Sequence, residues 1–168
     1  MVRILALGVL FFVLLLLQVG LVSFFKIAGV VPDLFLIVII FCGLWFGPRF
    51  GAGTGLVYGL LEDLFLGKYL GLNVLTKGIC GYLAGLGENR INRENWFTPV
   101  LFLMVGSVVH SALYLLGGYL AGQTRSIGPT LWWIVLPETI YNSCLAFLFF
   151  PLLGRAATKG ILRAGKPK

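Results

Sequence analysis

The sequence predicts an all-α integral membrane protein whose six transmembrane helices form one bundle, with both termini in the cytoplasm. Of its 168 residues, 59% are hydrophobic and only 11% are charged, and the mean hydropathy is +0.99. A soluble domain usually carries about a quarter charged residues. This chain has too few to cover a water-facing surface, so most of its surface must face lipid.

Six apolar runs form the expected helices, since crossing the hydrocarbon takes roughly 17–25 helical residues. The first run is about twice the length of a signal-peptide core and lacks a small-x-small cleavage site at its end, so we expect a retained helix. Gly47-Pro48-Arg49 separates the second run from the third, because proline disfavours helix in the residue before it. The expected spans are residues 4–25, 30–46, 50–66, 70–87, 96–121 and 131–153.

The basic residues indicate the orientation. With both termini cytoplasmic, nine basic residues flank the spans on the inner side and three on the outer side, as the positive-inside rule requires. All four tryptophans then fall at membrane interfaces, as in an aromatic belt. We expect a transmembrane domain over residues 1–153 and a basic cytoplasmic tail over 154–168 that anchors to anionic lipid. The basic residues of this tail are Arg155, Lys159, Arg163, Lys166 and Lys168.

Glycines recur every four residues in the third span and again in the fourth. This spacing keeps them near one helix face, where a neighbouring backbone can approach closely. We interpret the face as a packing surface between the two spans, or as a docking site for a partner helix or a second copy of the chain. Its members are Gly47, Gly51, Gly55, Gly59, Gly81 and Gly85.

Seven polar residues are expected in the outer half of the bundle: Glu62, Asp63, Asn73, Lys77, His110, Glu138 and Asn142. Asp63 lies four residues beyond Gly59 and continues the glycine face, so both acids of the Glu62-Asp63 pair should point inward. A charge at the bilayer centre costs about 2.5–3.5 kcal/mol. Either Lys77 pairs with Asp63 or Glu138 and the group lines an outward-facing polar pocket, or the acids lie at the water interface and cap the third span. A lone His110 is more typical of a hydrogen-bonded packing residue than of a ligand.

Motifs for catalysis or metal binding are not found: there is no GxSxG, HExxH or Walker loop. We therefore expect no enzyme, no cofactor and no metal. The chain has three cysteines, Cys42, Cys80 and Cys144. Their odd number and the lack of metal-ligand spacing favour a role as small buried apolar side chains. The formal net charge of +7 is concentrated in the tail, so nucleic acid is not an expected partner.

Several short motifs, in order, resemble the family of the rod shape-determining protein MreD. They are Pro32-Asp33-Leu34, GLLED at 59–63, Gly67, GLNVL at 71–75 and GYLAG at 81–85. The resemblance is concentrated in residues 32–85 and does not extend to Lys77, which is not a feature assumed for the family.

This resemblance implies a non-enzymatic scaffold of the bacterial cell-elongation (rod) complex, in the inner membrane. Such proteins are expected to bind the single transmembrane helix of MreC and to help control cell shape and lateral peptidoglycan synthesis. They thereby connect MreB filaments with the wall synthase and transpeptidase. The fold is also similar to the substrate-binding S-components of energy-coupling-factor transporters. The alternative is therefore a small-molecule-binding transporter subunit.

Overall fold

The computed structural model describes residues 2–24, 30–65, 70–88, 97–122 and 131–159, and the regular structure in these ranges is helical. One π-helical turn, η2, leads directly into the last helix. The elements are α1 (Val2–Phe24), α2 (Leu34–Phe46), α3 (Pro48–Phe65), α4 (Leu72–Gly85), α5 (Phe97–Leu120), η2 (Leu131–Val135) and α7 (Leu136–Lys159). The all-α prediction is confirmed, and each expected span corresponds to one helix.

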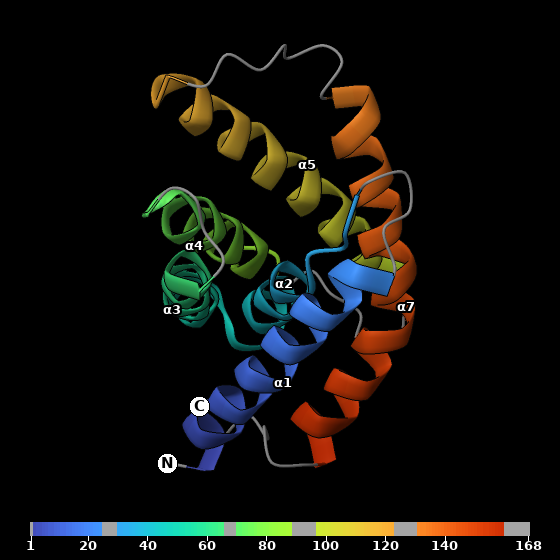
Figure 1. Ribbon diagram of the computed structural model, residues 1–168. Coiled ribbons are helices and arrows are strands. Elements are labelled where there is room, and N and C mark those ends of the chain that lie inside the picture. The colour runs from blue at the N-terminus through green and yellow to red at the C-terminus, as the bar shows by residue number, and fades with distance from the viewer. Residues whose placement is uncertain (1, 25–29, 66–69, 89–96, 123–130, 160–168) are drawn as a thin grey trace.

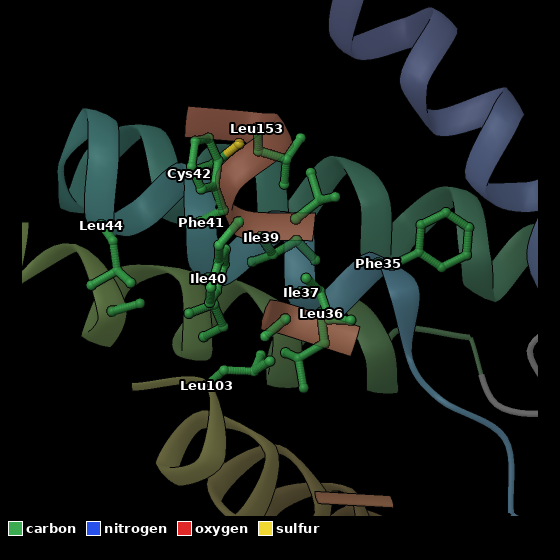
Figure 2. Close-up of a cluster of buried hydrophobic side chains, with 14 of the residues drawn as sticks. Phe35, Leu36, Ile37, Ile39, Ile40, Phe41, Cys42, Leu44, Leu103 and Leu153 are labelled. Atoms are coloured by element: carbon green, nitrogen blue, oxygen red, sulfur yellow. The ribbon is translucent and has the colours of Figure 1, made fainter. Parts of the chain in front are cut away.

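Helix α2 lies at the centre of the molecule and contacts each of the other five α-helices (Figure 1). Every residue from Leu34 to Trp45 is buried, because the helix is apolar on all sides and such helices are stable only inside a core. Figure 2 shows its side chains pointing in several directions, with Leu103 of α5 and Leu153 of α7 packed among them.

A sharp reversal connects α2 to α3. Gly47 has a positive φ of 88°, which glycine adopts without the steric cost of a Cβ. Its N–H donates to the Gly43 carbonyl at 2.9 Å and closes α2. Pro48 then opens α3, two residues before the expected start at Phe50, because the first helical position tolerates proline's missing N–H.

Among the described residues, two helices are individually long and apolar enough to cross a membrane: Phe97–Leu120 and Trp132–Ala157. Leu5–Gly20 and Leu34–Phe46 are apolar but shorter. Large apolar side chains are exposed on every helix except α2, as expected where lipid replaces water. The start of α1 and the end of α7 lie toward the same side in Figure 1. Six spans with both termini cytoplasmic stay a prediction.

Three sequence expectations change in the structure. Trp45 is buried against Phe41, with ring centroids 4.4 Å apart, and so does not face an interface; α2 is enclosed on all sides. Cys144 is exposed, whereas Cys42 and Cys80 are buried as expected. Helix α7 continues past residue 153 to Lys159, and Arg155 is exposed on it. Arg163, Lys166 and Lys168 lie outside the described residues.

Candidate functional site

The glycine face of α3 packs directly on α4. A Cβ added to Gly51 would collide with the carbonyl oxygen of Gly81, and one on Gly55 with the carbonyl oxygen of Lys77. At Gly59 the added Cβ would lie 2.5 Å from the carbonyl oxygen of Asn73. The packing interpretation is confirmed for α3 and α4, and the face is filled by the protein's own helix.

Two members of this glycine set lie where the chain turns from α2 to α3. A Cβ on Gly85 of α4 would collide with the backbone of Pro48. Gly47 differs from the others, because it lies outside the helices and faces the carboxylate of Glu88. By contrast, Gly53 of α3 points away from α4, and an added Cβ there would meet nothing within 4 Å.

The close approach of α3 and α4 encloses Lys77. Its side chain is 0% exposed, and its ammonium group forms ion pairs with Asp33 (Nζ–Oδ2 2.7 Å) and with Glu62. The predicted pairing of Lys77 with Asp63 or Glu138 is therefore wrong. Asp33 takes that place because α2 packs against both α3 and α4, a proximity that no spacing within the sequence shows.

Asp33 is also the N-cap of α2 and is only 8% exposed. Its carboxylate accepts from the N–H of Leu36 at 2.9 Å, and its own N–H donates to Oδ1 of Asn142 at 2.8 Å. Asn142 in turn donates to the hydroxyl of Ser107 at 3.2 Å. Asp33 is not among the seven polar residues expected in the outer half of the bundle. An aspartate immediately before an apolar run is an N-cap signal that could have placed it.

Gln18 of α1 also binds the start of α2, and the sequence pattern did not single it out. Its amide donates to the carbonyl of Pro32 at 2.8 Å and accepts from the N–H of Leu34 at 3.3 Å. Side chains from α1, α4 and α7 therefore all bind the first turn of α2. Four helices are fixed to one another at this point.

Asp63 has a different role from Glu62. It is 2% exposed and accepts from the N–H of Gly71 at 2.8 Å, from the side-chain amide of Asn73 at 2.8 Å and from the N–H of Val74 at 3.3 Å. The inward orientation is confirmed. Its contacts are with the start of α4 rather than with water at the end of α3, so it stabilises the N-terminus of the following helix.

His110 lies within the polar core and is 6% exposed. One ring nitrogen, one carboxylate oxygen of Asp33 and one of Glu138 all lie within 4.8 Å of one another. Neither ring nitrogen has a hydrogen-bond partner among the described residues, so the expectation of a hydrogen-bonded packing residue is wrong. Glu138 accepts a long hydrogen bond of 3.5 Å from Ser111.

The structure thus brings most of the predicted polar residues together. Six side chains form what we call the polar core: Asp33, Glu62, Lys77, His110, Glu138 and Asn142. Asp63 and Asn73 form the separate cap on α4. Aromatic and apolar groups close the polar core; the ring centroid of Phe35 lies 5.5 Å from the Lys77 ammonium nitrogen.

Three apolar grooves lie among the residues that the structure describes. One of about 400 Å³ lies between α1 and α3, and one of about 600 Å³ between α5 and the η2–α7 segment. A third of about 110 Å³ lies between α4 and α5. None of the three linings includes a residue of the predicted polar pocket. An outward-facing polar pocket stays a prediction.

Fold and site together define a small helical membrane protein with an ion-paired core, and the arrangement of its described polar groups shows no nucleophile activated by a base. Residues 1–155 match the sequence profile of the family described as rod shape-determining protein MreD. The chain belongs to this family, whose members are bacterial membrane proteins of the rod-shape system and are not known as enzymes. No curated protein and no solved structure is significantly similar to the chain.

Proposed function

We propose that this protein is a non-enzymatic membrane scaffold of the rod-shape system and that the groove between α1 and α3 binds the single transmembrane helix of an MreC-type partner. The family supports the cellular role. The observation that supports this binding site is a long apolar groove lined by two glycines with open space beside them. A partner bound there would connect MreB filaments inside with the wall synthase and transpeptidase outside.

The groove has the dimensions and chemistry of a helix-binding surface. Its lining follows α3 from Arg49 to Leu61, which at 1.5 Å per residue is about 18 Å, more than half of the hydrocarbon thickness. Gly8 of α1 and Gly53 of α3 both line it, and an added Cβ at either would meet nothing within 4 Å. Small residues of this kind let a second backbone approach closely, which drives helix association where lipid offers no hydrophobic force.

The floor of the groove is preformed. The hydroxyl of Tyr58 donates to the carbonyl of Leu7 at 2.7 Å and fixes α3 to α1. The Phe11 ring packs on Tyr58 with centroids 5.2 Å apart, and α4 supports α3 from its opposite face. A rigid surface loses little conformational entropy when a partner binds.

Co-purification in mild detergent with the single-span partner of the same genome tests this proposal. We expect Gly53→Leu to weaken the complex, because the new side chain fills the groove. Gly20→Leu is the matched control: it places the same change at an exposed, open position of α1 outside the groove lining. Gly55→Leu is unsuitable, since it would disrupt the α3–α4 contact.

Two outcomes would overturn the proposal at different levels. A complex that survives Gly53→Leu as well as it survives Gly20→Leu would reject the groove as the docking site. A wild-type protein that binds no single-span partner would reject the scaffold itself and favour the small-molecule-binding alternative. A ligand of that kind, at 100 times its dissociation constant, should stabilise the protein by about 2.7 kcal/mol.

The membrane arrangement is part of the same proposal. We infer a multi-pass protein of the bacterial inner membrane with both termini cytoplasmic, where the exposed Arg155 and the basic residues after it contact anionic lipid. Cysteine labelling from either side of the membrane tests the topology: a residue after position 160 should react only from the cytoplasmic side.

A further inference from the structure

We propose that Asp33, His110 and Glu138 form a binding site for one divalent transition-metal ion of the Zn²⁺ type. The sequence alone gave no reason to expect one, because the three residues are widely separated along the chain and share no metal-binding motif. The site is independent of partner binding at the α1–α3 groove.

The geometry brings three suitable ligand atoms together. One oxygen of Asp33, one nitrogen of His110 and one oxygen of Glu138 lie within 4.8 Å of one another, from the start of α2, from α5 and from α7. Zn–N and Zn–O bonds of 2.0–2.2 Å place neighbouring ligands of a tetrahedral site about 3.4 Å apart. The three atoms must therefore move together by at most about 1.4 Å, which side-chain rotations can supply.

His110 is the observation that calls for a ligand. Only 6% of the residue is exposed, so 94% of it is buried. Both ring nitrogens lack a hydrogen-bond partner among the described residues. A buried polar group without a partner costs free energy. Neutral imidazole is the commonest protein ligand for metals, so an ion bound to one nitrogen satisfies the group that the protein itself leaves unpaired.

The charges of the polar core favour a divalent cation. The ammonium group of Lys77 pairs with both Asp33 and Glu62, so the polar core, with Glu138 as its third carboxylate, keeps two formal negative charges. The carboxylates of the buried Asp33 and the partly buried Glu138 lie close together, and like charges at such a distance repel one another. An M²⁺ ion bound by both would neutralise them.

The existing contacts of these ligands are compatible with an ion. Asp33 already binds Lys77 through Oδ2 and the N–H of Leu36 through Oδ1, but each carboxylate oxygen has a second lone pair. Ser111 donates to Glu138 and can orient it as an outer-shell partner. A mixed imidazole and carboxylate set favours Zn²⁺ or Mn²⁺ over Mg²⁺ and Ca²⁺, which prefer oxygen ligands alone. Three protein ligands leave a fourth position for water.

Metal content and affinity test the site. The full chain, purified in detergent with a tag that carries no histidine, is saturated with Zn²⁺, desalted and measured by elemental mass spectrometry. Competition with a chromogenic chelator gives the dissociation constant. We expect one ion per chain and at least about tenfold weaker binding in both His110→Asn and Glu138→Gln. Glu88→Gln, which changes a carboxylate outside the polar core, should bind as tightly as wild type.

Cobalt provides a readout that does not depend on the variants folding well. Co²⁺ bound to wild type should give the visible absorption of a four- or five-coordinate nitrogen and oxygen site, and Zn²⁺ should displace it. A wild-type protein that retains no stoichiometric ion would overturn the proposal. It would mean that bound protons, rather than a metal ion, neutralise the carboxylates of the site. Folded His110→Asn and Glu138→Gln proteins that bind as tightly as wild type would also overturn it.

Discussion

Replacement of Lys77 by methionine should strongly destabilise the protein, because the carboxylates of the buried Asp33 and the partly buried Glu62 would lose their counter-charge. At the Nζ–Oδ2 distance of 2.7 Å to Asp33, the Coulomb attraction is about 6 kcal/mol in an effective dielectric of 20. The cost of burying the charges cancels part of this attraction. Removing one partner of a buried ion pair lowers the free energy of unfolding by about 3–5 kcal/mol. We expect a loss in that range for Lys77→Met.

Unfolding of the purified protein by titrated SDS in mixed micelles measures this loss. Arg49→Met removes a basic side chain at an exposed position and should change the free energy by no more than about 0.5 kcal/mol. Adding Asp33→Asn and Glu62→Gln to Lys77→Met should recover most of the loss, since neutral groups then replace the whole ion-paired set. Asparagine also caps helices, so the start of α2 is kept.

Two results would refute this reasoning. A Lys77→Met protein within about 1 kcal/mol of wild type would mean that the carboxylates do not depend on the ammonium group. A triple variant no more stable than Lys77→Met would mean that lost packing, rather than unpaired charge, causes the effect.

Three further variants test the neighbouring contacts by the same titration. Gly51→Ala should cost about 1–3 kcal/mol because its Cβ meets backbone of α4, whereas Gly53→Ala should be nearly neutral; equal costs would reject the packing. Asp63→Ala should cost about 2 kcal/mol through loss of the cap on α4, and an unchanged midpoint would contradict that role. Tyr58→Phe should cost about 1 kcal/mol by removing the hydrogen bond to Leu7; no change would show that this bond does not hold α1 to α3.

The helical class and the glycine packing were predictable because they depend on local pattern. Apolar run length predicts helices, and a four-residue glycine spacing predicts a close helix contact without naming the partner element. Gly51, Gly55 and Gly59 do contact α4, which agrees with the interpretation of the face as a packing surface between the two spans. The same spacing showed that Asp63 points inward, because it continues the face to which Gly59 belongs.

Five of the six members of the polar core were predictable, but Asp33 and the pairs that the residues form were not. Lys77, Glu62, His110, Glu138 and Asn142 stand out as costly groups in an apolar chain, whatever the tertiary structure. Their partners depend on how the helices pack, and the central position of α2 places Asp33 beside Lys77, 44 positions further along the chain. Position relative to an apolar run predicts depth in the membrane, but it does not predict which face of one helix meets another.

The sequence by itself determined that this is a helical membrane protein of the MreD type, since composition, run length and motif order are properties of the chain alone. Only the tertiary structure decided which acids bind Lys77. It also decided that neither ring nitrogen of His110 has a partner among the described residues, and that α4 packs on the glycine face of α3. These depend on contacts between helices distant in sequence, and several pairings of the same charged residues satisfy the same hydrophobic pattern.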